Sequence, residues 1–206
     1  MNRVWEVKVK KAEVIKYFKS LYPAENDGGG VWLFTLKDDE VGYSRMSPQL
    51  TNLTGQQKIG ISLVMNPRFF CDLKTEIYQN NGGSLLFTIG NGNIFIKAGG
   101  EITEVHLDEI TKIAFDWIDK CSMEEVIAAE LKHKYEIYNR PGGWQFTHII
   151  ACVLKGDVER LQSYLNAFKR GDRMEFIPII KQEYFERAIP LAEKYRSGER
   201  ASPVAF

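Results

Sequence analysis

The chain has 206 residues, of which 44% are hydrophobic and 26% are charged. This composition is ordinary for a globular protein and disfavours disorder before about the last ten residues. Lysine plus arginine equals aspartate plus glutamate, 27 of each, so no global charge points toward nucleic acid or an anionic membrane surface. We therefore expect neither a nucleic-acid partner nor a membrane partner.

The amino-terminal sequence MNRVWEVKVKK lacks the apolar run and the small-residue cleavage site of a secretory signal, which predicts a cytoplasmic location. The three cysteines, Cys71, Cys121 and Cys152, are an odd number at wide spacing. That pattern differs from a disulfide framework and from a paired-cysteine zinc site. We expect all three thiols to be reduced, and the sequence predicts neither a metal site nor a cofactor.

Residues 10 to 22 are predicted to form an amphipathic helix, because apolar residues recur at helical spacing while lysines occupy the remaining face. The apolar positions are Val14, Ile15, Phe18, Leu21 and Tyr22. Pro23 and the glycine-rich run from Asn26 to Gly30 end this helix.

Short segments rich in β-branched and aromatic residues follow, which is typical of strands. They cover residues 31 to 36, 41 to 44, 58 to 65 and 84 to 90. Asn91-Gly92 predicts a type I′ hairpin turn leading into a further strand at 93 to 98. The segment from Pro67 to Gln79 fits a helix or a strand, and both assignments stay open.

The pattern becomes helical after Gly99-Gly100. One apolar stripe comprises Ile110, Ile113, Ala114, Trp117 and Ile118, and a second comprises Met123, Ile127, Leu131 and Tyr135. Ser122 with Glu125 three residues later predicts a capping box at the start of the second helix.

The segment from Trp144 to Leu154 contains no charged residue and is predicted to be the buried helix at the centre of the fold. Gly156-Asp157 should end this helix and cap the next. A last helix is expected after Pro178, kinked or split at Pro190.

These elements predict an α+β fold: a mainly antiparallel sheet over about residues 30 to 98, packed with an N-terminal helix and a C-terminal cluster of about five helices. We expect a single domain over 1–206, with a sheet-rich half (1–100), a helical half (101–196) and a flexible tail (197–206).

His148 and Cys152 lie four residues apart on one helical face, a spacing that could present two metal ligands or a thiol beside a base. Cys152 lies near the end of an apolar helix, where nothing favours the thiolate, so the core interpretation is favoured. The alternative is an enzyme or ligand-binding pocket between sheet and helices that draws on Trp144, His148, Tyr135 and Tyr138. No GxSxG, HExxH or CxxC motif accompanies these residues.

Charge is distributed unevenly along the chain. The segment from Glu101 to Glu130 contains nine acidic residues and two lysines, a local net charge of minus seven. The first twenty residues contain six basic residues and two acidic ones. Two solvated helix faces would explain this pattern, and so would an acidic surface that steers a basic partner toward itself. On the second interpretation the partner-binding residues are Asp108, Glu109, Asp116, Asp119, Glu124 and Glu125.

The aromatic-rich helical segment GGWQFTHIIACVLKGD, together with the chain length, the α+β pattern and the lack of catalytic motifs, resembles bacterial immunity proteins. These are small inhibitors that neutralise a cognate toxin. The resemblance implies a non-enzymatic protein of the bacterial cytoplasm whose partner is a toxin domain with a basic active site, such as a nuclease.

Overall fold

A computed structural model describes residues 11–79, 85–97, 100, 102–137 and 143–204 of the chain. Its contacts divide the chain into two compact units, each assembled from separate stretches of sequence. Unit 1 comprises residues 1–66 and 88–121, and unit 2 comprises residues 67–87 and 122–206. The fold is α+β, as predicted, with one antiparallel sheet, an N-terminal helix and C-terminal helices.

Unit 1 contains a five-stranded sheet in the order β1-β2-β3-β4-β5, so strands that follow one another in sequence are neighbours. The strands are β1 (Ala24–Asn26), β2 (Trp32–Asp38), β3 (Gly42–Leu53), β4 (Gln56–Pro67) and β5 (Thr88–Lys97). The β4–β5 pairing is antiparallel and runs without a bulge from Gln56↔Lys97 to Met65↔Thr88.

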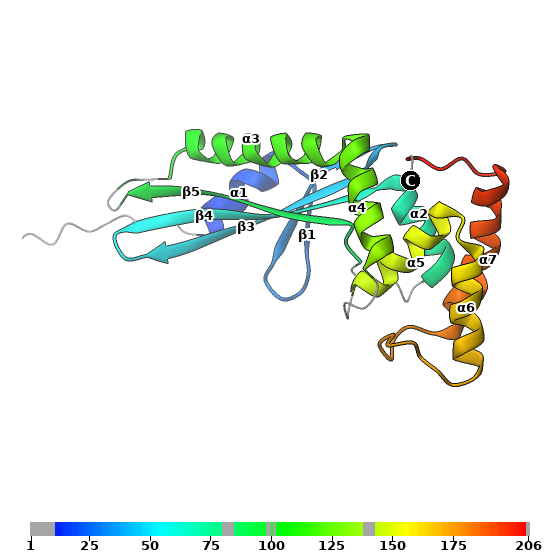
Figure 1. The fold of residues 1–206 in the computed structure, drawn as a ribbon. Helices are drawn as coiled ribbons and strands as arrows, with labels where there is room; N and C mark the ends of the chain where they lie inside the picture. The colour runs from blue at the N-terminus through cyan, green and yellow to red at the C-terminus, as the bar shows by residue number, and fades with distance from the viewer. Residues whose placement is uncertain (1–10, 80–84, 98–99, 101, 138–142, 205–206) are drawn as a thin grey trace, which may run out of the picture. The chain divides into compact units, whose positions relative to one another are not determined.

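Helices α1 (Lys11–Leu21) and α3 (Glu104–Cys121) both cover the same face of this sheet (Figure 1). Phe18 of α1, Ile110 of α3 and Phe34, Met46 and Ile59 of the sheet meet in one core and are fully buried. Alternating strand residues point into this core, and the amphipathic stripes of both helices close it. The predicted N-terminal helix is therefore confirmed.

The hairpin predicted at Asn91-Gly92 is wrong, because β5 continues straight through both residues. The glycines serve helix packing instead. A Cβ atom on Gly90 would lie 2.2 Å from Cε2 of Trp117, and one on Gly92 would lie 2.6 Å from Cγ2 of Ile113. Both contacts are closer than packed atoms allow, so only glycine lets α3 approach β5 this closely.

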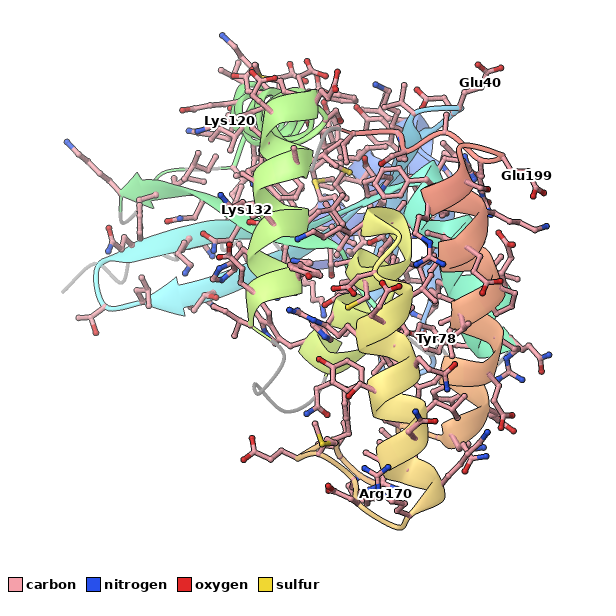
Figure 2. All side chains as sticks on the ribbon, turned by 45° about the vertical axis from the view of Figure 1, so that its right-hand side comes forward. Glu40, Tyr78, Lys120, Lys132, Arg170 and Glu199 are labelled. Atoms are coloured by element: carbon pink, nitrogen blue, oxygen red, sulfur yellow. The ribbon has the colours of Figure 1, made fainter. Side chains whose placement is uncertain are left out.

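Unit 2 is built around α5 (Gly143–Lys155), in which every residue from Gln145 to Leu154 is buried. The prediction of a buried central helix is thus confirmed. Its neighbours are α2 (Arg68–Tyr78), α4 (Glu124–Glu136), α6 (Val158–Lys169) and α7 (Gln182–Ser197) (Figures 1 and 2). The segment left open between helix and strand is the helix α2. It joins this unit through Tyr78, whose hydroxyl donates to the carbonyl of Phe146 at 2.6 Å.

Several predicted boundaries need correction. Leu85 to Phe87 lie outside β5, because Phe87 packs edge-on against Phe70 of α2 at 5.2 Å between ring centroids. The N-cap of α4 is Met123 rather than Ser122, and its carbonyl accepts from the amides of Val126 and Ile127. The strand predicted at 41–44 extends to Leu53.

The end of the chain follows the predicted pattern only in part. Gly156 has a positive φ of 70°, and the Asp157 carboxylate accepts from the amide of Arg160 at 3.1 Å, which confirms the predicted stop and cap. Helix α7 is continuous through Pro190, so the helix is not split there. Beyond it, Arg200 contacts Glu76 at 2.7 Å and Val204 is buried.

The predicted division at residue 100 does not coincide with the two units. Helix α3, expected in the helical half, belongs to the sheet unit, and α2 belongs to the helical unit. None of the helices in the described ranges is long and apolar enough to cross a membrane.

Candidate functional site: an acidic helix and a buried polar network

Helix α3 exposes most of the predicted partner-binding residues. Its buried stripe is Leu107, Ile110, Ala114, Ile118 and Cys121, which has the spacing of one helix face. The acids occupy the remaining circumference, and all of them are exposed: Glu104, Asp108, Glu109, Asp116 and Asp119. Only Lys112 and Lys120 offset them on this helix.

The structure brings four of the six predicted residues onto one helix of unit 1. Glu124 and Glu125 are exposed as well, but they lie in the first turn of α4 and belong to unit 2. Acidic side chains in a first turn stabilise the helix by complementing the positive end of its dipole, so the presence of Glu124 and Glu125 is explained without a binding partner. The α3 residues are therefore the coherent part of the predicted site.

Asp108 is held in place on the side of α3 that faces α1. The hydroxyl of Tyr17 donates to its carboxylate at 2.5 Å. This hydrogen bond, with burial adding to it, raises the pKa of Tyr17 to about 12, so the phenol stays protonated and remains a hydrogen-bond donor at physiological pH. Tyr22, which directly follows α1, and Phe115 of α3 approach on the same side, at 6.3 Å between ring centroids.

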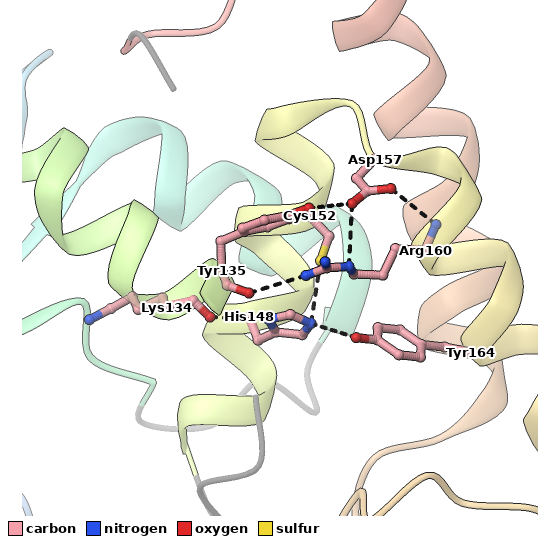
Figure 3. A network of polar contacts seen from close by, with 7 residues as sticks. All are labelled: Lys134, Tyr135, His148, Cys152, Asp157, Arg160 and Tyr164. Atoms are coloured by element: carbon pink, nitrogen blue, oxygen red, sulfur yellow. Dashed lines mark hydrogen bonds and ion pairs between the residues drawn. The ribbon is translucent and has the colours of Figure 1, made fainter. Parts of the chain in front are cut away.

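The alternative site, around His148 and Cys152, is a polar network inside unit 2 (Figure 3). His148 is fully buried. Its Nδ1 lies 3.1 Å from the carbonyl oxygen of Lys134, and its Nε2 lies 3.1 Å from the Tyr164 hydroxyl and 3.4 Å from Sγ of Cys152. Because a carbonyl can only accept, Nδ1 carries the proton and Nε2 accepts from the hydroxyl.

Burial sets the protonation of this pair. Desolvation lowers the pKa of His148 to about 4, although the hydrogen bond that the ring donates to the Lys134 carbonyl acts to raise that pKa. The imidazole is therefore neutral at physiological pH. Desolvation likewise raises the pKa of the Cys152 thiol, which keeps the sulfur protonated. A nucleophilic cysteine needs the opposite shift. The favoured core interpretation of His148 and Cys152 agrees with this geometry.

The outer rim of the network is charged. The Tyr135 hydroxyl donates to Asp157 at 2.5 Å, and the Arg160 guanidinium contacts the same carboxylate at 3.3 Å (Figure 3). Burial pushes the pKa of Asp157 upward, but the hydrogen bonds from Tyr135 and from the Arg160 amide, together with the charges of Arg160 and Lys155, outweigh it and lower that pKa. Lys155 and Arg160 lie over the Tyr135 ring at 3.8 and 4.2 Å from its centroid. The rim thus ties the end of α4 to the α5–α6 turn.

Lys134 is a buried residue that the sequence analysis missed. Its side chain is 7% exposed, and its ammonium contacts Glu130 at 2.9 Å and lies about 5 Å from the rings of Phe87 and Trp144. A glutamate four residues before a lysine was the available signal, but that spacing is usual on exposed helix faces too. Tyr138, the remaining residue of the proposed pocket, lies outside the described residues.

A depression on the surface of unit 2 is lined by side chains of α6 and by Arg170. Glu159, Gln162, Ser163 and Asn166 are among them, and no member of the His148 network is. The feature therefore gives a substrate no route to the imidazole or the thiol.

The fold and its surface define an α+β protein with an exposed acidic helix on its sheet and a buried polar network in its helical unit. The chain belongs to a family of unknown function, DUF6990, whose profile matches residues 10–193. No curated protein and no solved structure matches it.

Proposed function

We propose that this protein is a non-enzymatic binding protein, an immunity-type inhibitor that docks the acidic surface of α3 on a basic toxin domain in the bacterial cytoplasm. The observation that supports it is the exposure of five carboxylates against two lysines on this helix. Exposed acids attract a basic partner within about a Debye length, before contact, and this attraction raises the association rate.

Helix α1, next to α3, would determine the orientation in which a partner docks. Lys11, Lys16 and Lys19 are exposed on α1, which covers the same face of the sheet as α3. The sheet unit therefore presents a basic helix beside an acidic one, linked by the hydrogen bond from Tyr17 to Asp108. A partner with a matching pair of patches is favoured in one orientation, since like charges would meet in the reverse one.

An enzyme at the His148 network is the weaker alternative. The imidazole and the thiol are both fully buried, and burial keeps each of them neutral. Neither group is prepared to act as a base or as a nucleophile on a molecule arriving from solvent.

The test is a pair of charge reversals with the same change in net charge. One variant carries Asp116→Lys and Asp119→Lys on α3; its control carries Glu124→Lys and Glu125→Lys on α4. The partner is first captured from a lysate of the host on the immobilised protein and identified by mass spectrometry. Association and dissociation rates are then measured at low salt and at about 150 mM salt, where the Debye length is about 8 Å.

We expect the α3 variant to associate at least tenfold more slowly at low salt, to lose most of that difference at the higher salt, and to melt as the wild type does, because exposed charges contribute little to stability. The control should associate nearly as the wild type does. Equal rates for the α3 variant and the wild type, or capture of no basic protein, would contradict the proposal.

A further inference from the structure

The two edges of the sheet in unit 1 differ greatly. The edge strand β1 has three residues, whereas the opposite edge strand β5 has ten and pairs with β4 without a bulge. In an antiparallel ladder alternate residues turn their amide and carbonyl groups toward one neighbour, so about five residues of β5 direct theirs away from β4. Within the described residues the sheet ends at β5, which leaves this row without a strand partner.

The usual protections of an edge strand are sparse in β5. It contains no proline, and its single charged residue is Lys97 at the last position. On the face opposite α3 it exposes two large apolar side chains, Ile89 at 67% and Phe95 at 57%. These would become cross-strand neighbours of an added strand.

Helix α3 overhangs the same edge. Ile113 and Trp117 lie against Gly92 and Gly90 of β5 and are only partly buried. Glu109 lies one turn before Ile113 and Asp116 lies two turns after Glu109, so these acids share the side of the helix turned away from Asp108 and α1. Lys120 follows one turn later on that side.

We propose that the free edge of β5 binds an extended segment of the partner by strand addition, and that the segment alternates basic and apolar residues. This rests on the proposed function and names the part of the partner that would dock. Main-chain hydrogen bonds to β5 supply affinity, and contacts of Ile89 and Phe95 with side chains of the added strand set its register. Glu109 and Asp116 select basic residues on the α3 side.

The charge pattern argues against the other obvious occupant, a second copy of this chain. Pairing of two β5 strands about a twofold axis would bring two acidic α3 helices toward the same interface. Like charges at an interface are unfavourable. A basic segment from another protein would be attracted by the acidic helix and would not suffer this repulsion.

The test uses three synthetic ten-residue peptides as probes. The first alternates lysine and valine, the second replaces every lysine with glutamate, and the third replaces two valines of the basic peptide with proline. Binding is measured by calorimetry on the whole protein, and hydrogen exchange of the β5 amides reports where a peptide binds. A proline cannot donate to the ladder, so the third peptide keeps the charge but loses strand pairing.

Two protein variants accompany the peptides. The edge variant carries Ile89→Lys and Phe95→Lys, and its matched control carries Val41→Lys and Leu53→Lys, which are 53% and 42% exposed in the same unit. We expect the basic peptide to slow exchange in β5, the edge variant to bind it at least tenfold more weakly, and the control variant to bind it as the wild type does. The glutamate and proline peptides should bind at least tenfold more weakly than the basic one.

Each half of the proposal can fail separately. Equal binding of the basic and the proline peptide, or unchanged exchange in β5, overturns strand addition while leaving docking through the acidic helix intact. Equal binding of the lysine and glutamate peptides, with β5 protected, overturns the choice of a basic segment. Sedimentation of the free protein as a dimer that the edge variant abolishes would assign the edge to a second copy and overturn the proposal.

Discussion

Gly90 and Gly92 show how a single residue type can be required for a reason that local sequence does not reveal. A glycine after an asparagine is typical of a tight turn, yet here both glycines lie in a straight strand under α3. Trp117 and Ile113 occupy the space where their side chains would begin. Gly60, on the paired strand β4, has only ordinary contacts at its Cβ position, the nearest at 3.7 Å.

We predict that Gly90→Ala destabilises the protein by about 1 to 3 kcal/mol, because the added methyl group would overlap the Trp117 indole. Chemical denaturation measures the change, and Gly60→Ala is the control, expected to be near neutral. Shortening the clashing side chain in a Gly90→Ala/Trp117→Leu double variant should recover part of the loss. Equal effects of the two alanine substitutions would contradict the packing explanation.

His148 gives the protein a predicted dependence on pH. Its pKa falls from 6.5 in the unfolded chain to about 4 in the folded one because of burial. Between these values the unfolded chain binds more protons, so the contribution of His148 to stability is complete above pH 6.5 and is lost as the pH falls toward 4.

We predict that this loss amounts to roughly 3 kcal/mol between pH 7 and pH 4. Denaturation at a series of pH values should show a steeper fall for the wild type than for a His148→Gln variant, in which the carboxylates still titrate but the imidazole is gone. Parallel curves for the two proteins would mean that His148 is not neutral in the folded state.

At the scale of elements, α5 organises unit 2. Ten successive residues from Gln145 to Leu154 are buried, and α2, α4, α6 and α7 all contact this helix. Even its polar residues are satisfied internally: the Gln145 side chain donates to the carbonyl of Glu175 and accepts from the amide of Ile177. Such a helix tolerates few cavities.

We predict that Ile150→Ala costs about 2 to 5 kcal/mol, because a fully buried isoleucine leaves a cavity that close packing cannot refill. Ile179, which is 54% exposed in the same unit, is the matched position, and Ile179→Ala should cost less than about 0.5 kcal/mol. Comparable losses at the two positions in a denaturation experiment would show that α5 is peripheral.

At the scale of the whole molecule, the chain passes between the two units three times. Helix α2 is sequence-distant from the rest of unit 2, yet it supplies Tyr78, which bonds to Phe146, and its Ile77 carbonyl accepts from Arg187 at 2.6 Å. Tyr78 and Ile77 are both fully buried. Unit 2 therefore depends on a segment inserted between two strands of unit 1.

We predict that a fragment of residues 122–206 alone melts well below the whole protein and binds a hydrophobic dye, since the surface that α2 covers becomes exposed. Addition of a synthetic peptide of residues 67–87 should raise its melting temperature and displace the dye. A scrambled peptide of the same composition is the control. A fragment that is already fully stable without the peptide would contradict this dependence.

The sequence by itself determined the α+β class, the helix at Lys11–Leu21, the helical second half, and the burial of the helix from Gln145 to Leu154, because hydrophobic periodicity is a local property. It also located the acids of α3 and the cap at Asp157. It could not assign Pro67 to Gln79, whose helix is stabilised by partners far along the chain, and it placed a turn at Asn91-Gly92.

Only the tertiary structure decided which side chains meet. The close approach of Trp117 to Gly90, the burial of Lys134 and the neutral state of His148 depend on contacts between elements far apart in sequence. The assignment of Glu124 and Glu125 to a different unit from the α3 acids also follows from the contacts within each unit. Periodicity tells which face of a helix is apolar, but not which neighbour covers it or how closely. Close packing and desolvation act on those neighbours, so the strand glycines and the state of the buried imidazole follow from the assembled fold.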